Sequence, residues 1–313
     1  AEWLVDAGQF DEAEKRYRRI LAERPDSAMA HRQLGQLLLQ LGRRTEASLS
    51  FRHLAQFDIL NQEELRSLLI LSKPFPKDAE TNRLKPFNRL ARARQAIATA
   101  RFDEALEVLG SAPIDYEASL KARVHSLRNE WDAVRRWAST LDVARTDDAD
   151  SWFALGSLAA SEGDHPKAIE CFARTLLIDQ TDAEAYDSFA ASLRAVNEST
   201  VAEEASKRAE TIRQTQQIGA TLTLDSNNRE RIAKLVVLLE QLRRPLEVLG
   251  WQSIDLVFAA ERGLIAESQA ALTFTDLVQK RQHLLRTGQH RLDASFILCG
   301  LEFNPNSSNA LGN

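Results

Sequence analysis

The sequence predicts an all-α protein built from stacked helix-turn-helix repeats, and three observations point to this fold class. A unit of 34 residues, 149–182, is followed in the same frame by a second unit, 183–216. The 313 residues are 44% apolar, with only 12 glycines and 8 prolines, and Val, Ile and Thr rarely alternate with polar residues. A fixed period of this length is typical of a helical solenoid, in which each repeat buries its apolar face against its neighbours.

The two adjacent units place large, small and turn residues at the same offsets. Large side chains are expected to fill the grooves between helix pairs, and small ones to lie where two helices cross closely. Gly163 is expected at the C′ position of the first helix of this unit. Asp164 is expected to be the N-cap of the second helix, with Pro166 in the first turn of that helix. The matching positions are Trp152, Leu155, Gly156, Ala159, Gly163, Ala168 and Phe172, then Tyr186, Phe189, Ala190, Leu193, Asn197, Ala202 and Ser206.

This pattern resembles the tetratricopeptide repeat (TPR) family. The resemblance implies a right-handed superhelical solenoid that binds a peptide or a partner subunit in its concave groove and is not an enzyme. A fainter resemblance, carried by Arg244–Trp251 and the proline-rich residues 73–77, is to TPR regions attached to FG-GAP propeller and ASPIC-type domains in bacterial proteins. It implies an alternative function, as the arm of a larger enzyme or of a secreted multidomain protein.

Continuing the frame over residues 1–313 predicts a single TPR solenoid that is truncated within a repeat at both ends, with two or three irregular interruptions. In the short repeat 86–114, a strict frame would bury Arg89 and Arg92, which is unfavourable for charged side chains. A frame slipped by one residue is therefore preferred, and it predicts Leu90, Ala93 and Ile97 in the core. The expected parts are a partial repeat at 1–27, repeats at 28–61, 86–114, 115–148, 149–182, 183–216, 229–262 and 274–307, and irregular segments at 62–85, 217–228 and 263–273.

The irregular segments are where a specific function is most expected. The leucines within 65–69 continue the first-helix pattern, but Lys73-Pro74-Phe75-Pro76-Lys77 stands where a second helix is due. Two prolines so close cannot continue a helix, so we expect residues 74–86, here called the strap, to be an ordered loop or extended. Thr221–Leu224 is a second candidate for an extended piece. Loops on a rigid scaffold often carry binding residues; the alternative for each segment is a tolerated surface insertion.

The net charge of −5 conceals an asymmetry along the chain. Residues 1–148 hold 24 Lys/Arg against 23 Asp/Glu, whereas residues 149–313 hold 16 against 22. A basic patch that receives an acidic peptide is one interpretation of the first half, and a solvated helix face is the alternative. Nucleic acid is not expected, because the chain is acidic overall and has no nucleic-acid-binding motif. Thr81–Phe102 lacks acidic residues and contains Arg83, Lys85, Arg89, Arg92, Arg94 and Arg101.

The sequence contains no pattern typical of catalysis or metal binding. It has no His-Glu-x-x-His run, CxxC pair, phosphate-binding glycine loop or Gly-x-Ser-x-Gly elbow, so no enzymatic activity and no cofactor are expected. Cys171 and Cys299 fall in different repeats, and a disulfide between them is not expected. No run approaches the roughly 20 apolar residues of a membrane span. A soluble protein is expected, with the cytoplasm favoured and a periplasmic or secreted location as the alternative because the N-terminus looks truncated.

The TPR resemblance also implies that recognition uses first-helix residues on the concave side. In this frame the groove is basic early and acidic late, which suits an extended or helical partner of opposite polarity. TPR modules that clamp a C-terminal carboxylate use a Lys and an Asn where this chain has Arg32 and Gln36, so that activity is not implied. The candidate partner-binding residues are Arg32, Gln33, Gln36, Arg94, Tyr116, Arg123, Asp150, Phe153, Glu184 and Asp187, with Gln40 one turn after Gln36.

Overall fold

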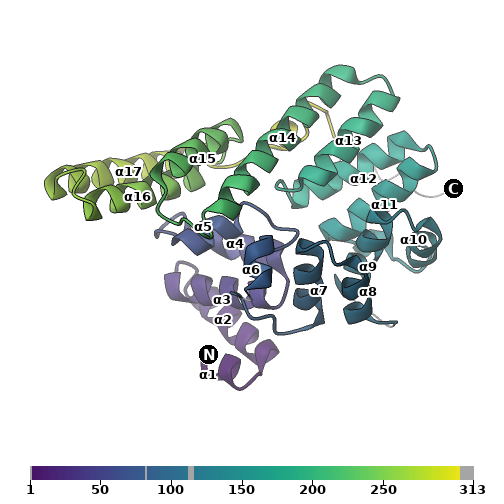
Figure 1. Cartoon of the computed structure of the whole chain (residues 1–313), viewed down its shortest axis with the longest axis horizontal. Helices are drawn as coiled ribbons and strands as arrows, with labels where there is room; N and C mark the ends of the chain where they lie inside the picture. The colour runs from purple at the N-terminus through teal and green to yellow at the C-terminus, as the bar shows by residue number, and fades with distance from the viewer. Residues whose placement is uncertain (1, 82, 112–115, 304–313) are drawn as a thin grey trace. The chain divides into compact units, whose positions relative to one another are not determined.

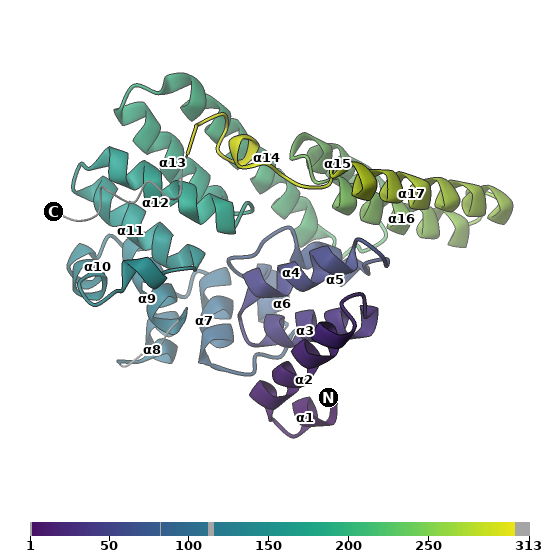
Figure 2. The ribbon, with the colours of Figure 1, turned by 180° about the vertical axis from the view of Figure 1, so that it is seen from behind.

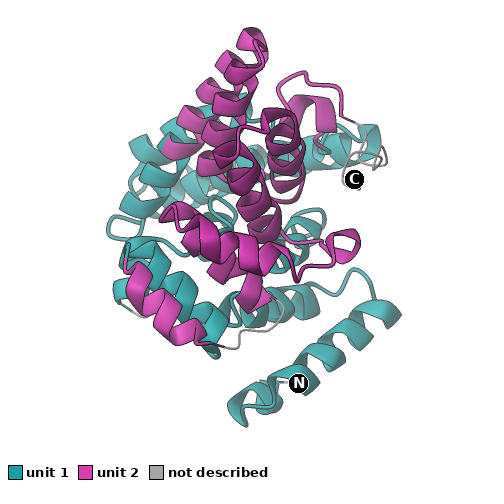
Figure 3. Ribbon diagram, turned by 90° about the vertical axis from the view of Figure 1, so that its right-hand side faces the viewer, with its two compact units in different colours: residues 1–100, 214–291 teal, residues 101–213, 292–313 magenta. Residues whose placement is uncertain are grey.

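The computed structural model describes residues 2–81, 83–111 and 116–303, in which every regular element is a helix (Figure 1; Figure 2 gives the opposite view). The prediction of an all-α helical repeat protein is thereby confirmed. The chain divides into two compact units, which Figure 3 shows in different colours. Unit 1 comprises residues 1–100 and 214–291, and unit 2 comprises residues 101–213 and 292–313. Among the described residues, no helix has the length and apolar character needed to cross a lipid bilayer.

Successive helices pack against one another along much of the described chain. The 23-residue α14 (Ser199–Thr221) belongs to unit 2 up to Arg213 and to unit 1 from Gln214. The helices of unit 1 are α1 (Glu2–Asp6), α2 (Phe10–Glu23), α3 (Ala28–Gln40), α4 (Arg44–Leu54), α5 (Gln62–Ser67), α6 (Pro76–Glu80), α7 (Arg89–Ala98), α15 (Arg229–Gln241), α16 (Pro245–Glu261) and α17 (Glu267–Thr287). Those of unit 2 are α8 (Phe102–Leu109), α9 (Tyr116–Leu127), α10 (Trp131–Ala138), the 3-10 helix η1 (Val143–Arg145), α11 (Ala149–Ser161), α12 (His165–Ile178), α13 (Ala183–Ala195) and α18 (Ala294–Ile297).

Small residues lie where paired helices cross, as the repeat pattern predicts. A Cβ on Gly156 of α11 would lie only 2.8 Å from a ring carbon of Phe172 on α12. The turn between these helices also follows the prediction: Gly163 has φ +81°, and the Asp164 side chain accepts a hydrogen bond of 3.1 Å from the backbone N–H of Lys167. The slipped frame of α7 is likewise supported, because its three predicted core residues Leu90, Ala93 and Ile97 are buried.

The segments predicted to be irregular contain more helix than expected. The strap includes α6, because Pro76 stands in the first turn of a helix, where its missing N–H is not needed. The expected extended piece at Thr221–Leu224 is wrong: α14 continues to Thr221 and a turn follows. Residues 263–273 contain the start of α17, a single helix of 21 residues.

The core of unit 1 joins segments that are far apart in the sequence. The segment at 62–73 lacks a second helix of its own, and α16 packs against α5 instead. A Cβ on Gly250 of α16 would lie 2.7 Å from Leu65, and Arg244 Nη2 donates a hydrogen bond of 2.6 Å to the carbonyl of Leu68. Trp251 is fully buried in the same core. This packing explains why unit 1 combines residues 1–100 with residues 214–291.

Candidate functional site

A cavity in unit 1 lies between α3, α4, α5 and the strap. Its volume is about 230 Å³. Its lining is mixed, with apolar side chains beside a larger number of polar and charged ones. We call it the strap cavity. Its lining consists of Gln36, Leu39 and Gln40 of α3, Arg44 and Phe51 of α4, Glu63, Glu64, Arg66 and Ser67 of α5, and Pro74, Phe75, Asp78, Arg83 and Leu84 of the strap.

Arg66 of α5 links the strap to α14. Its guanidinium donates a hydrogen bond of 2.8 Å to Asp78, and another of 3.1 Å to the carbonyl of Gly219. The guanidinium carbon lies 4.9 Å from the ring centroid of Phe75. Burial lowers the pKa of Arg66 against the opposing effect of Asp78. A buried cation that binds both a strap residue and α14 holds the cavity wall in one position, and no signal in the repeat frame singles it out.

The strap cavity is bordered on α3 by two glutamines one turn apart, Gln36 and Gln40. Neither side-chain amide has a hydrogen-bond partner among the described residues, and both are partly exposed. An amide carries donors and an acceptor, and residues four apart on a helix lie side by side. The two amides can therefore hydrogen-bond a peptide backbone in the cavity. Gln33, which the sequence also predicts, lies on α3 but does not line the cavity.

Two predicted basic residues of unit 1 form contacts within the chain. Arg32 donates hydrogen bonds of 2.6 Å to Glu64 and 2.9 Å to the carbonyl of Ile59, so it holds the turn before α5. Arg94 is buried and donates hydrogen bonds of 2.8 Å to the carbonyl of Gly42 and 2.6 Å to that of Ser72. Both guanidinium groups are therefore already used to stabilise loops of unit 1.

Gly42 shows how closely these loops pack. Its φ of +76° is a backbone conformation that favours glycine. A Cβ at this position would lie 2.8 Å from the backbone nitrogen of Ala91 at the start of α7. The turn after α3 thus contacts α7 directly, and Arg94 of α7 reaches back to the Gly42 carbonyl.

In unit 2, four predicted site residues meet in one cluster. Arg123 of α9 is buried, and its guanidinium lies 2.6 Å from Asp182, 3.3 Å from Asp150 of α11 and 3.3 Å from Glu184 of α13. Its guanidinium carbon also lies 4.0 Å from the ring centroid of Phe153. Burial disfavours the charge of Arg123, but the carboxylates of Asp182, Asp150 and Glu184 outweigh this and raise its pKa. We call these five residues the Arg123 cluster; it links the first helices of three successive repeats.

The other predicted residues of unit 2 lie outside the Arg123 cluster. Asp187 is half-exposed on α13 and forms an ion pair with Arg213 of α14. Tyr116 is the first residue of α9 and is partly buried. Within the Arg123 cluster, only Glu184 is substantially exposed, at 47% of its side chain. The cluster therefore offers a partner little more than this one carboxylate.

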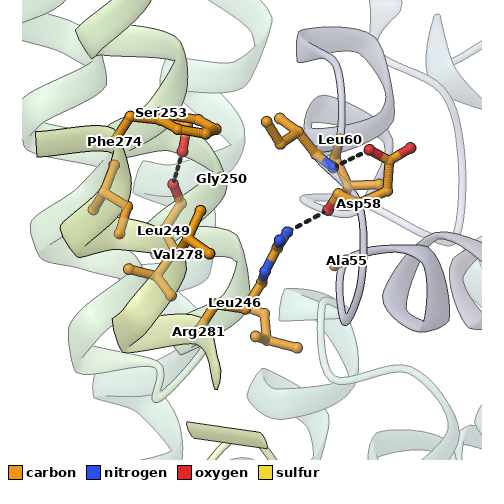
Figure 4. Close-up of a pocket in the computed structure, with 12 residues that line it drawn as sticks. Ala55, Asp58, Leu60, Leu246, Leu249, Gly250, Ser253, Phe274, Val278 and Arg281 are labelled. Atoms are coloured by element: carbon orange, nitrogen blue, oxygen red, sulfur yellow. Dashed lines mark hydrogen bonds between the residues drawn. The ribbon is translucent and has the colours of Figure 1, made fainter. Parts of the chain in front are cut away.

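A second cavity in unit 1 is much smaller (Figure 4). It lies between residues 55–60, α16 and α17, where Arg281 Nη1 donates a hydrogen bond of 2.8 Å to the carbonyl of Asp58. Its volume of about 30 Å³ corresponds to about one water molecule. It does not have room for a peptide side chain, so the strap cavity is the better candidate site.

Successive helices with small residues at their crossings identify this chain as a helical-repeat protein. The family model described as tetratricopeptide repeat matches residues 3–57 and 132–196. The chain thus carries tetratricopeptide repeats at these residues, as the repeat pattern suggested. Such repeats generally mediate protein–protein interaction and are typically non-catalytic scaffolds. A comparison with curated proteins finds no match, and no finding supports the resemblance to FG-GAP and ASPIC-type proteins.

Proposed function

We propose that the chain is an interaction scaffold that binds a segment of a partner protein in the strap cavity. The observation that carries this proposal is the cavity of about 230 Å³ between the first-helix residues of α3 and α5 and the strap. Pockets for drug-sized molecules measure about 300–1,000 Å³. A smaller cavity on a repeat surface suits one side chain of a longer peptide.

The lining of the strap cavity indicates the chemistry of that peptide. Leu39, Phe75 and Leu84 give it an apolar part, where an aliphatic or aromatic anchor residue of the partner is buried. The amides of Gln36 and Gln40 then bind the backbone on either side of the anchor. An extended peptide fits this arrangement, because its backbone groups are not used in hydrogen bonds of its own.

Acidic residues on either side of the anchor are expected to strengthen binding. Lys85 follows Leu84 in the strap, and Lys85, Arg89 and Arg92 are all exposed. Charges at the rim of an interface contribute mainly to the association rate and to its salt dependence. We therefore propose a partner segment with an apolar anchor and acidic flanks. The alternative function, as the arm of a larger protein, would use the same surface for a covalently linked or stably associated subunit.

Replacing both cavity glutamines by leucine is expected to weaken peptide binding. The full chain is first used to select peptides from a random twelve-residue display library, and the tightest peptide is then titrated by fluorescence anisotropy. Gln36→Leu/Gln40→Leu preserves side-chain size but removes two hydrogen-bonding amides. The expected loss is about 10- to 100-fold in Kd, because each net hydrogen bond contributes about 0.5–1.5 kcal/mol.

The matched control is Gln279→Leu/Gln282→Leu, two exposed glutamines one turn apart on α17. This variant is expected to bind the selected peptide as the wild-type chain does. Equal binding by all three proteins, or a selection that enriches no peptide, would contradict the proposed site. Binding that does not weaken between low and high salt would contradict the acidic flanks while leaving the cavity itself supported.

A further inference from the structure

Residues 292–303, here called the returning segment, pack on the last repeat of unit 2 (Figure 2). The hydroxyl of Tyr186 on α13 donates a hydrogen bond of 2.9 Å to the carbonyl of Ile297. Arg208 of α14 donates to the carbonyl of Phe296, and its guanidinium carbon lies 3.9 Å from the Phe296 ring centroid. Ile297 is buried, and α18 packs against α12. Three helices of unit 2 thus contact one short segment.

Tyr186 and Arg208, the two residues that hydrogen-bond the returning segment, have equivalents one repeat earlier. Tyr186 stands 34 residues after Trp152 (186 − 152 = 34), and Arg208 stands 34 after Arg174 (208 − 174 = 34). In the earlier repeat, the Arg174 guanidinium carbon lies 4.7 Å from the Trp152 ring centroid, and α12 packs against the following helix, α13. The next helices along the chain, α15 and α16, belong to unit 1. The returning segment therefore packs on the last repeat of unit 2. It contacts Tyr186 and Arg208, the positions that Trp152 and Arg174 hold one repeat earlier.

Aromatic side chains of the returning segment stack on arginines at the same repeat position. Phe296 stacks on Arg208, and Phe303 lies 5.8 Å from the guanidinium carbon of Arg174. A guanidinium over an aromatic ring is attracted by the electrons of the ring face, more strongly where water is excluded. Arg208 is 7% exposed. These contacts select an aromatic residue, whatever chain supplies it.

The polar contacts are made to the backbone of the returning segment. Tyr186 and Arg208 both donate to carbonyl oxygens, which any peptide offers. Only the side chains can therefore make this contact specific for one sequence. These are the ring of Phe296 and the buried side chains of Ile297 and Leu298. Asp293 accepts a hydrogen bond from the backbone N–H of Phe296 and so begins the single helical turn. A partner peptide with a capping Asp, an aromatic residue three positions later and two aliphatic residues next would make the same contacts.

We propose that the face formed by Tyr186 and Arg208 is a second peptide-docking site, occupied by the returning segment and open to a partner peptide of the same Asp-x-x-aromatic-aliphatic-aliphatic chemistry. The returning segment acts as an intramolecular ligand that the partner displaces. This site shares no residue with the strap cavity, so an experiment can contradict one proposed site without contradicting the other.

A peptide that copies residues 290–303, with Cys299→Ser, tests the site directly. In the full chain, Phe296→Ala is expected to weaken docking of the returning segment and to leave the repeat helices folded. It is expected to bind the labelled peptide saturably, and the wild-type chain is expected to bind it more weakly, because its own segment competes. A peptide that also carries Phe296→Ala, or a chain that also carries Arg208→Ala, is expected to reduce the affinity by about tenfold, as lost stacking on a guanidinium predicts.

Cys299 reports on displacement in the wild-type chain. It is half-buried in the returning segment, and burial raises the pKa of its thiol to about 11. The thiolate is the reactive form, so iodoacetamide modifies a docked Cys299 slowly. Saturating copy peptide is expected to accelerate its modification by at least about tenfold, as its pKa returns towards about 8.5. Cys171, buried within α12, is the internal reference and stays unmodified.

Three results would overturn the proposal. The first is that the copy peptide does not bind the Phe296→Ala chain, or binds it regardless of Arg208. The second is that Phe296→Ala abolishes the helical circular dichroism signal, which would make the returning segment part of the core rather than a removable ligand. The third is that the peptide exposes Cys171 together with Cys299, which would show unfolding instead of exchange.

Discussion

Replacing Arg123 by methionine is expected to destabilise unit 2 by about 3–5 kcal/mol, the usual cost of removing one partner from a buried ion pair. Asp150 and Asp182 are 5% and 3% exposed and would lose the guanidinium that neutralises them. Phe153 would lose the cation stacked on its ring. Urea unfolding read by hydrogen exchange in peptides from α9 to α13 measures the loss of free energy within unit 2.

Two further variants separate the ion pair from ordinary side-chain loss. Arg136→Met removes an exposed arginine of α10 and is expected to change stability by no more than about 0.5 kcal/mol. Arg123→Met/Asp182→Asn is expected to recover part of the loss, because asparagine can still accept the N-cap hydrogen bond from Ala185 without a buried charge. A cost for Arg123→Met no greater than that of Arg136→Met would show that the Arg123 cluster does not stabilise the repeats.

Trp251→Ala is expected to destabilise unit 1 by about 3–5 kcal/mol, the range for removing a buried Trp or Phe side chain. Trp251 is fully buried on α16, in the core that α16 shares with α5 and α3. Because these helices share one core, hydrogen exchange is expected to accelerate in α3 and α5 as well as in α15 and α16. Exchange confined to α15–α17 would contradict the joint core of unit 1.

The control at this position is Trp251→Phe, which keeps most of the ring. The indole N–H of Trp251 has no hydrogen-bond partner among the described residues. Removing a buried N–H that has no partner recovers part of its desolvation cost, so the smaller ring is expected to cost much less than alanine. Trp3→Ala, at a side chain 59% exposed, is expected to have only a small effect.

The regular repeats are predictable because their contacts lie within neighbouring repeats. Gly156 meets Phe172 within a single repeat, and the spacing of Leu90, Ala93 and Ile97 alone identifies the buried face of α7. Such positions recur at the same place in each repeat, so the sequence period is enough to predict their role in packing. Solenoid contacts of this kind are local by construction.

The core of unit 1 could not be predicted in the same way. Arg244 binds the carbonyl of Leu68 across 176 residues of sequence. A repeat frame relates each repeat only to the next one, so it contains no information about this pairing. The leucines of 62–73 indicated a first helix that lacks a second helix beside it. Only the structure shows that α16 packs in that place.

Charged positions on the first helices were ambiguous for a related reason. Arg32, Arg94 and Arg123 have the spacing of groove residues, yet each binds acidic or carbonyl groups of its own unit. Those partners come from turns and neighbouring helices whose positions depend on the fold. Gln36 belongs to the same predicted set and does line a cavity, because the strap, singled out by its two prolines, passes beside it.

Hydrogen exchange of the full chain with and without the tightest library-selected peptide tests most directly whether a partner segment binds in the strap cavity. We expect slower exchange at saturation in residues 36–40 and 63–67 and in the described residues of 74–84. We expect no such change for the Gln36→Leu/Gln40→Leu variant at the same peptide concentration. Slower exchange confined to unit 2, or equal protection in both proteins, would contradict binding in the strap cavity.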